Sequence, residues 1–348
     1  MESLEIIFLM KVICFGNLGY VGTVIDDYLK KKFHYTGFDN RYFDKCKVIP
    51  FERVKNQIYG DVRELEDFNL NGFDSLIYLA ALSNDPIGKE FSEVTHQINQ
   101  VSAIKLAVKA KKNGVKKFVY ASSCSVYGRG GNDVKKESDP LNPLTAYAKS
   151  KIEAENELRK LSSSTFNVIC LRFATACGYS NRLRLDLVLN DFVASAFFNN
   201  QIKLLSNGES WRPLIDVNDM ARAIEWAVKE VNSFENNFLS LNIGSANWNF
   251  KIIDLAKLVS KVLGNIPLKY SNRAFDDPRS YKVDFSLFKK LAPNFQPQVK
   301  IDDCIKKLHS MIEKNIPIKD YNSEKLIRLS YLKKLIYEKK INKNLTWI

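Results

Sequence analysis

Hydrophobic residues between Lys11 and about residue 175 form short apolar runs, separated by longer stretches with helical spacing. The runs at 12–15, 35–38, 47–50, 75–79, 117–121 and 167–171 predict strands, and the stretches at 94–113 and 147–162 predict long helices. Strands that alternate with helices are typical of successive βαβ units, which build a mainly parallel sheet. The pattern therefore predicts an α/β fold for this half of the chain.

The pattern changes after residue 175, where helices are predicted at 187–198, 217–231, 252–263 and 301–313 among short strands and Pro/Gly breaks. We interpret this part as a smaller α/β portion packed beside the sheet. The predicted division is an N-terminal extension at 1–9, a core domain at 10–178, a second portion at 179–318 with some elements returning to the core domain, and a basic C-terminal helical extension at 319–348.

The C-terminal extension carries an apolar stripe with helical spacing between residues 323 and 343, and lysines lie opposite the stripe. The stripe consists of Leu326, Leu329, Leu332, Leu335 and Ile336. We expect an amphipathic helix that lies on the domain. A membrane-surface or nucleic-acid role is the alternative, but no aromatic-interleaved basic patch accompanies the charge.

Composition excludes several classes of protein. The chain has 348 residues, is 45% hydrophobic and carries a formal net charge of +13 that is spread along its length, which excludes collagen, coiled coil and wholesale disorder. Its six cysteines show no CxxC pair, its three histidines are scattered, and no apolar run approaches the roughly 18 residues of a membrane span. We therefore expect a cytoplasmic protein with no metal site, no membrane span and no nucleic-acid partner.

A glycine-rich loop follows the first predicted strand and precedes a helical stretch. It reads Gly16-Asn17-Leu18-Gly19-Tyr20-Val21-Gly22, and Asp39 ends the next predicted strand 17 residues later. Glycines let backbone N–H groups approach a pyrophosphate, and the carboxylate can accept both ribose hydroxyls of an adenosine. The pattern predicts a dinucleotide site and favours NAD over NADP, with Arg41 as the residue that would soften this preference.

A second constellation combines a serine at the end of the fifth predicted strand with a tyrosine and a lysine on the following helix. Tyr147 and Lys151 are spaced i, i+4, so both side chains share one helix face. An ammonium beside a phenol stabilises the phenolate, so Tyr147 becomes a usable base for a hydroxyl. Ser123 would hydrogen-bond and align the same hydroxyl, which makes Ser123, Tyr147 and Lys151 the predicted catalytic residues.

With these motifs the chain resembles the extended short-chain dehydrogenase/reductase superfamily, in its NAD-dependent nucleotide-sugar epimerase/dehydratase branch. The resemblance runs from Lys11 to about Lys314 and implies a Rossmann doubly wound parallel sheet, a smaller C-terminal α/β substrate domain, and a homodimer paired through a four-helix bundle of 94–113 and 147–162. The cofactor contacts that it implies are Gly16, Asn17, Leu18, Gly19, Tyr20, Val21, Gly22, Asp39, Asn40, Asp61, Val62, Leu79, Ala80, Ala81, Asn99, Tyr147 and Lys151.

The resemblance also implies a substrate side, a nucleoside-diphosphate sugar held by Ser83, Ser125, Thr175, Asn190, Arg212 and Arg279. Arg212 lies in an element similar to R-x-x-x-x-V-x-D, and Arg279 lies in a late arginine loop that begins at Asp276 and Asp277. Guanidinium groups suit a diphosphate because each can donate two hydrogen bonds and neither loses its charge.

The chain departs from the family's dehydratases directly after Ser123. Those enzymes carry an Asp-Glu pair there, whereas this chain has Cys124 and Ser125, so dehydration is disfavoured. Adjacent residues at a strand end point to opposite sides, so we expect Cys124 to be packed rather than catalytic. Cys177 is expected to be a packing residue as well.

The predicted reaction is oxidation of a sugar hydroxyl, at carbon 4, by hydride transfer to NAD with Tyr147 as base, in the synthesis of surface polysaccharide sugars. Epimerisation and dehydrogenation use the same residues, as does an NAD(P)H-dependent 4-ketosugar reductase. Two further alternatives are an NADPH-dependent enzyme acting on a small carbonyl compound and a non-catalytic dinucleotide-sensing protein on the same fold.

Overall fold

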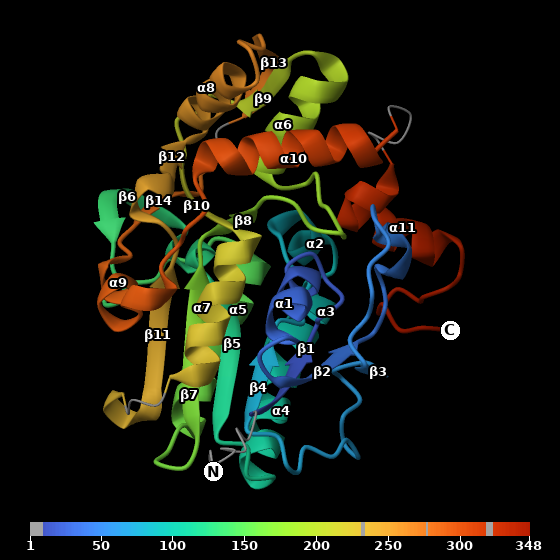
Figure 1. Cartoon of the computed structure of the whole chain (residues 1–348), viewed down its shortest axis with the longest axis vertical. Coiled ribbons are helices and arrows are strands. Elements are labelled where there is room, and N and C mark those ends of the chain that lie inside the picture. Colours follow the sequence, from blue (N-terminus) through green and yellow to red (C-terminus); the bar gives the residue numbers. More distant parts are fainter. Residues whose placement is uncertain (1–9, 231–233, 276–277, 318–322) are drawn as a thin grey trace, which may run out of the picture.

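The structure is a computed structural model that describes residues 10–230, 234–275, 278–317 and 323–348. The predicted extension at 1–9 and the residues Asp276 and Asp277 lie outside these ranges. At the centre is a sheet of seven strands, all parallel (Figure 1). Its order is β11 (Phe238–Ile243), β7 (Asn167–Phe173), β5 (Lys117–Ser123), β4 (Ser75–Tyr78), β1 (Lys11–Phe15), β2 (His34–Asp39) and β3 (Asn56–Tyr59).

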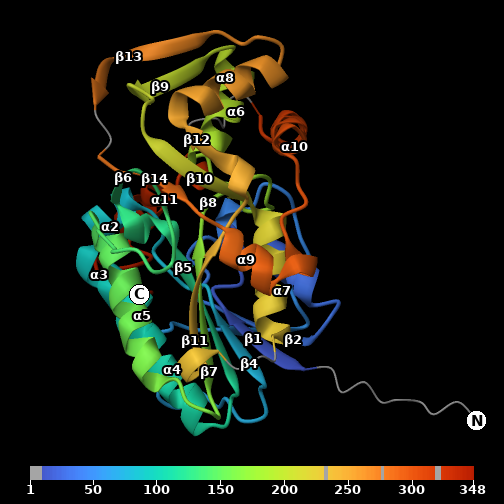
Figure 2. The same cartoon turned by 90° about the vertical axis from the view of Figure 1, so that its left-hand side faces the viewer.

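Helices cover both faces of the sheet. One face carries α1 (Gly22–Leu29) and α7 (Val217–Lys229), and the other carries α2 (Asp85–Glu90), α3 (Ser92–His96), α4 (Ser102–Lys112) and α5 (Ala146–Leu161) (Figure 2). A π-helical turn, Gln97–Val101, joins α3 to α4. Strand side chains alternate between the two faces: Val119 belongs to the apolar core of the first face, whereas Phe118 and Tyr120 belong to that of the second. This arrangement confirms the predicted doubly wound Rossmann fold.

One predicted strand is wrong. Residues 47–50 form no strand, and the third β-segment of the chain is β3, which begins at Asn56. The backbone N–H of Val48 instead donates to the carbonyl of Asn181 (2.8 Å), so this stretch is bonded to a distant loop rather than to the sheet. The sequence of β3, Asn-Gln-Ile-Tyr, is half polar because β3 is an edge strand, and it therefore lacks the apolar run of an inner strand.

The remaining elements lie beyond the carboxyl ends of the strands, at the top of Figure 1, and along the β11 edge. They are β6 (Arg129–Lys135), β8 (Thr175–Cys177), α6 (Val188–Asn199), β9 (Ile202–Ser206), β10 (Trp211–Asp216), β12 (Asn249–Lys251), α8 (Ile252–Val262), β13 (Leu268–Phe275), β14 (Ser280–Val283), α9 (Ser286–Leu291) and α10 (Ile301–Asn315). Small sheets join them in the orders β12-β10-β8, β13-β9 and β14-β6. Together they place side chains above the carboxyl edge of the central sheet.

The C-terminal part of the chain returns to the core domain. Its helix α11 (Arg328–Tyr337) is shorter than the predicted stripe, because the chain turns after Tyr337 and ends with a bridge between Ile341 and Trp347. Leu332 and Leu335 are buried in the same apolar core as α4 and α5. No helix in the described ranges is long and apolar enough to cross a membrane.

Candidate active site

A cavity of about 790 Å³ opens at the carboxyl edge of the central sheet, beneath the second portion of the chain. In a doubly wound sheet this edge, where the strand order reverses between β1 and β4, is where ligands bind. The cavity brings together most of the predicted site: Gly16, Gly19, Tyr20, Val21, Gly22, Asp39, Asn40, Val62, Leu79, Ala80, Ala81, Ser83, Ser123, Ser125, Tyr147, Lys151, Thr175, Arg212 and Arg279.

The glycine loop has the close packing that a dinucleotide cradle needs. Gly16 has a φ of +87°, and a Cβ there would lie 2.5 Å from the backbone nitrogen of Ala80. A Cβ at Gly22 would lie 2.4 Å from the carbonyl oxygen of Asn17, whereas the Cβ position of Gly19 has a single neighbour within 4 Å, at 3.3 Å. Glycine is therefore required at two positions for packing, and the loop presents an unobstructed backbone to the cavity. These residues fit a dinucleotide.

Asp39 lies at the end of β2 beside this loop. Its carboxylate accepts hydrogen bonds from the backbone N–H groups of Leu18 (3.1 Å) and Arg41 (2.7 Å). Burial raises the pKa of Asp39, and these two hydrogen bonds oppose the rise. The Arg41 side chain donates to Asp44 (3.0 Å) and lies over the ring of Tyr59 (4.8 Å). The Arg41 guanidinium is therefore bound to Asp44 and Tyr59 rather than held beside Asp39, where it would pair with a 2′-phosphate. This arrangement favours NAD over NADP.

Some predicted cofactor contacts stand behind the cavity wall rather than on it. The Asn17 amide donates to Asp26 (2.7 Å) and Gln57 (2.8 Å), which ties the glycine loop to α1 and β3. Leu18 is buried, and Asp61 is ion-paired with Arg63 (2.6 Å). These side chains hold the loops that reach the cavity, and their direct contact with a cofactor stays a prediction.

Two buried asparagines also support the wall. Asn99 lies in the π-helical turn and binds both the N–H (2.9 Å) and the carbonyl (3.2 Å) of Leu82, so it fixes the loop after β4. Asn190, on α6, accepts from the N–H of Gly178 (3.0 Å) and donates to the hydroxyl of Tyr20 (3.1 Å). Neither residue lines the cavity, and the predicted contact of Asn190 with a diphosphate stays a prediction.

The predicted catalytic lysine is held under the cavity floor by α5, whose first turn is capped by Thr145. The Lys151 ammonium donates to the carbonyl of Ala121 (2.7 Å) and lies 4.6 Å from the ring centroid of Tyr120 and 5.6 Å from that of Tyr147. Burial lowers the pKa of Lys151 to about 7, although the charge of Glu155 opposes this shift. Lys151 is therefore a lysine that can exchange its proton near neutral pH.

Tyr147 lies on the cavity wall one helical turn before Lys151. Burial raises the pKa of its phenol, while a hydrogen bond with Ser123 and the charge of Arg184 lower it. Ser123 ends β5, and its hydroxyl accepts from the N–H of Ser125 (3.1 Å). The Ser125 hydroxyl is buried at the cavity and has no hydrogen-bond partner among the described residues, so a bound hydroxyl could satisfy it.

A buried ion pair supports α5 from below. Glu155, one turn after Lys151, accepts from the Arg172 guanidinium (2.7 Å) and from the hydroxyls of Ser240 (3.0 Å) and Ser122. These bonds join α5 to β5, β7 and β11. The pair therefore fixes the register between the helix that carries Tyr147 and the strand that carries Ser123.

Two of the three predicted diphosphate contacts, Arg212 and Arg279, lie together at the cavity. Arg212 donates to the carbonyls of Trp211 (2.8 Å) and Arg279, and Arg279 forms an ion pair with Asp85 at the start of α2. The second oxygen of the Asp85 carboxylate is buried without a hydrogen-bond partner in the described part of the chain. The structure thus places both guanidinium groups at the cavity, with Asp85 as a competitor for Arg279.

Sequence reasoning missed one charged pair in the cavity. Arg184 donates to the Ser83 hydroxyl (2.8 Å) and forms an ion pair with Asp186 (2.8 Å), and its charge acts on Tyr147. The cluster of charged residues in Arg-Leu-Arg-Leu-Asp at 182–186 was the available signal, but these residues lie in a loop, so no strand or helix period tells which side chain faces the cavity. Only the fold shows that Arg184 faces Ser83.

The cysteines near the site are packed as expected. Cys124 is buried with its thiol directed to the carbonyl of Arg172 (3.0 Å), and Cys177 is buried with its thiol directed to that of Ile215 (3.4 Å). Neither lines the cavity.

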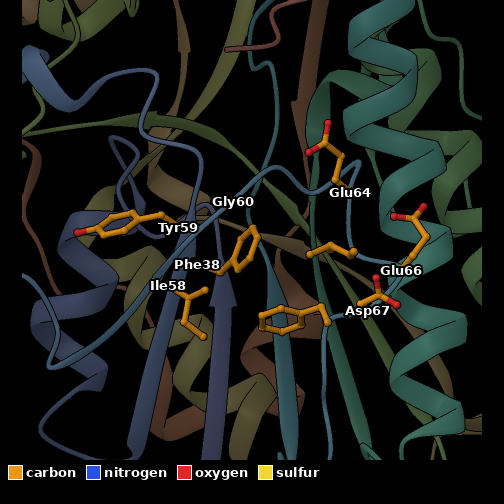
Figure 3. A pocket seen from close by; sticks show the side chains of 9 residues that line it. Phe38, Ile58, Tyr59, Gly60, Glu64, Glu66 and Asp67 are labelled. Atoms are coloured by element: carbon orange, nitrogen blue, oxygen red, sulfur yellow. The ribbon is translucent and has the colours of Figure 1, made fainter. Parts of the chain in front are cut away.

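A second, smaller cavity of about 440 Å³ lies at the ends of β2 and β3. Figure 3 shows Phe38 at its centre, Tyr59 on one side, and the acidic side chains of Glu64, Glu66 and Asp67 on the other. It contains none of the predicted catalytic residues. We therefore assign the active site to the larger cavity.

Comparison with known proteins agrees with this geometry. The model of the NAD dependent epimerase/dehydratase family matches residues 12–244. The chain is 22% identical over 315 residues to a protein from Bacillus subtilis called uncharacterized UDP-glucose epimerase YtcB, covering 84% of this chain and 95% of that one. It is 24% identical over 264 residues to the N-acetyl-alpha-D-glucosaminyl-diphospho-ditrans,octacis-undecaprenol 4-epimerase of Escherichia coli O157:H7, covering 74% and 75% of the two chains.

Solved structures share the fold. A UDP-N-acetylglucosamine 4-epimerase from Methanobrevibacter ruminantium, in complex with UDP-N-acetylmuramic acid, superposes with a TM-score of 0.77 at 24% identity and covers 88% of this chain and 99% of its own. MoeE5 in complex with UDP-glucose and NAD gives a TM-score of 0.75 at 21% identity, with 88% and 100% covered. Because the family model matches about two thirds of its length, the chain belongs to the NAD-dependent epimerase/dehydratase family, and its cofactor is NAD.

Proposed function

We propose that this protein is an enzyme that oxidises the carbon-4 hydroxyl of a nucleoside-diphosphate sugar and then reduces the resulting ketone from the opposite face, as a 4-epimerase. The observation that carries the proposal is the shared cavity. Tyr147, Lys151 and Ser123 line the same cavity as the glycine loop, Arg212 and Arg279.

Each catalytic side chain has a distinct task in this proposal. The Tyr147 phenolate takes the proton of the carbon-4 hydroxyl, and Ser123 hydrogen-bonds the same oxygen and keeps it in line. Lys151, whose ammonium lies 5.6 Å from the centroid of the Tyr147 ring, would supply positive charge that favours the phenolate. The glycine loop and Asp39 would hold NAD, whose nicotinamide would accept the hydride of carbon 4.

In this proposal, Arg212 and Arg279 bind the diphosphate of the substrate. Arg212 and Arg279 lie together at the cavity, and two fixed positive charges suit a diphosphate better than they suit an uncharged small carbonyl compound. The names of the relatives, a UDP-glucose epimerase and a UDP-N-acetylglucosamine 4-epimerase among them, support a UDP-linked hexose as substrate.

The residues after Ser123 support epimerisation over dehydration. A dehydratase needs an acid and a base at carbons 5 and 6, but the Cys124 thiol is directed to the carbonyl of Arg172, and Ser125 offers only a hydroxyl. A 4-dehydrogenase or a 4-ketosugar reductase would use the same side chains. Retention of the cofactor separates these outcomes from epimerisation.

The test is turnover of UDP-hexoses by purified wild type and a Tyr147→Phe variant, with Tyr337→Phe as the matched control because Tyr337 is 88% exposed on α11. We expect the 4-epimer to form without net change in reduced-nicotinamide absorbance. Tyr147→Phe should lower kcat by about 10²–10⁴-fold, and Tyr337→Phe should leave it unchanged. Equal turnover by both variants would favour a role without Tyr147 chemistry, and build-up of reduced nicotinamide would indicate a dehydrogenase.

We further propose that the protein acts in the cytoplasm, in the supply of surface polysaccharide sugars, as a homodimer. The pairing surface would be α4 and α5, which form adjacent helices on one face of the sheet (Figure 2). Sedimentation of the wild type against a variant with charges reversed on the exposed side of α5, at Lys149 and Glu153, tests the dimer.

A further inference from the structure

The C-terminal segment 323–348, which we term the C-terminal strap, lies outside the matched family region and is integrated into the core of the protein. It consists of a short 3₁₀ turn (Glu324–Leu326), α11 and the final turn. Its apolar side chains Tyr331, Leu332, Leu335, Ile341 and Leu345 are buried together with the core of the sheet face that carries α4 and α5. Figure 1 shows it beside the β3 edge of the sheet.

The first attachment of the strap is to the loop above the cavity. The N–H of Leu185 donates to the carbonyl of Leu326 (2.9 Å). The guanidinium of Arg328, only 2% exposed, donates to the carbonyls of Arg182 and Leu183 (3.3 Å). The strap therefore holds the backbone of 182–185, the stretch that directs Arg184 toward Ser83 and Tyr147.

The second attachment is to the two loops at the adenosine end of the cavity. The indole N–H of Trp347 donates to the carbonyl of Asn40 (2.7 Å), and the hydroxyl of Tyr42 donates to the carbonyl of Leu345. The guanidinium of Arg63 donates to the same Leu345 carbonyl (3.0 Å). Asn40 and Tyr42 follow Asp39, and Arg63 follows Val62, so the strap joins the loop after β2 to the loop after β3.

Between these two attachments, residues 327–330 of the strap line the cavity itself. We propose that the strap is a cofactor-retaining element, with Arg328 and Trp347 as positioning residues that hold the two walls of the NAD site together. Release of NAD then requires the walls to separate, so each strap contact slows dissociation. The proposal deepens the proposed function and rests on it in one respect: a cofactor that stays bound between oxidation and reduction makes the reaction redox-neutral.

The test measures cofactor dissociation without any sugar. The full chain is loaded with NADH, chased with excess NAD, and followed by the fluorescence of bound NADH. Trp347→Phe keeps an aromatic ring but loses the donor to Asn40, and the ring is 44% exposed, so the fold is not at risk. Tyr42→Phe loses only a hydroxyl, and Tyr337→Phe, exposed on the same strap, is the matched control.

We expect the dissociation rate constant of NADH to rise by about threefold to tenfold in Trp347→Phe and in Tyr42→Phe, which is the factor for one lost hydrogen bond. It should rise further in the double variant that combines these two substitutions, and it should not change in Tyr337→Phe. Arg328→Met should also raise the dissociation rate constant of NADH, and Arg328→Lys should raise it less than Arg328→Met does. Nucleotide-free Trp347→Phe should stay folded, with its free energy of unfolding lowered by no more than the contribution of one hydrogen bond. An unchanged rate constant in the double variant would overturn the proposal and reduce the strap to a packing element.

The outcome is independent of the sugar chemistry. If NADH dissociates faster in the strap variants while no UDP-hexose is epimerised, the strap proposal stands and the proposed function fails. If epimerisation is observed but the strap variants release NADH at the wild-type rate, the proposed function stands and the strap proposal fails.

Discussion

Replacing Lys151 by methionine tests how the structure prepares its catalytic lysine. The ammonium is 2% exposed, and burial lowers its pKa from 10.5 to about 7. The difference between the two pKa values corresponds to about 5 kcal/mol of destabilisation at pH values where the lysine is charged in both states. Removing the amine also leaves the Ala121 carbonyl without its donor, at a cost of about 1–3 kcal/mol. Methionine should therefore stabilise the protein by about 2–4 kcal/mol at pH 6.5.

The sign of the pH dependence follows from the same pKa. Because the pKa of Lys151 is lower in the folded state, the folded protein binds fewer protons than the unfolded chain between about pH 7 and pH 10.5. The destabilisation caused by burying the charged Lys151 is fully present below about pH 7, and it decreases as pH rises from about 7 to 10.5. The advantage of the methionine variant should thus shrink toward pH 10.

The assay is urea unfolding of nucleotide-free protein at several pH values between 6 and 10, with kcat measured in parallel. Lys257→Met, at an exposed lysine on α8 outside the proposed pairing surface, is the control and should change neither quantity. Lys151→Met should lower kcat by at least about 10²-fold while raising stability. A Lys151→Met variant that is no more stable than the wild type at pH 6.5, or whose added stability does not depend on pH, would contradict this expectation.

Three further changes follow from individual contacts. Glu155→Gln leaves the buried Arg172 guanidinium without its counter-ion, so chemical denaturation should show a loss of about 3–5 kcal/mol; an unchanged free energy of unfolding would contradict this. Gly22→Ala brings a Cβ within 2.4 Å of a loop carbonyl, so calorimetry should show NAD affinity reduced at least about tenfold. Asp85→Asn removes the carboxylate charge that pairs with Arg279, so KM for the nucleotide sugar should fall about two- to fivefold at constant kcat; a rise in KM would count against the assignment.

The inner strands and the glycine loop were predictable because local pattern and tertiary environment agree there. In β5, for example, residues 118–120 are buried on both faces of the sheet and therefore read as a continuous apolar run, Phe-Val-Tyr. The spacing of Tyr147 and Lys151 fixes their common helix face without any tertiary information. The edge strand β3 was not among the predicted strands. Its residues are partly exposed to solvent and half of them are polar, so its sequence carries no apolar run.

The walls of the cavity were not predictable in the same way. Arg184 reaches Ser83 across 101 positions of sequence, and Trp347 reaches Asn40 across 307. Contacts of this kind depend on how loops close over the sheet, which no local periodicity encodes. The sequence predicted a helix in the C-terminal extension but contained no sign that this segment lines the active-site cavity.

The central claim, proton removal by Tyr147 coupled to hydride removal at carbon 4, is tested most directly with a UDP-hexose deuterated at carbon 4. The label is followed by mass spectrometry and NMR of the product in ordinary water. We expect a 4-epimer that keeps the deuterium at carbon 4 and takes up no solvent hydrogen there, and that forms about 10²–10⁴-fold more slowly with Tyr147→Phe. Loss of the label to solvent, or exchange at carbon 5 instead, would contradict it.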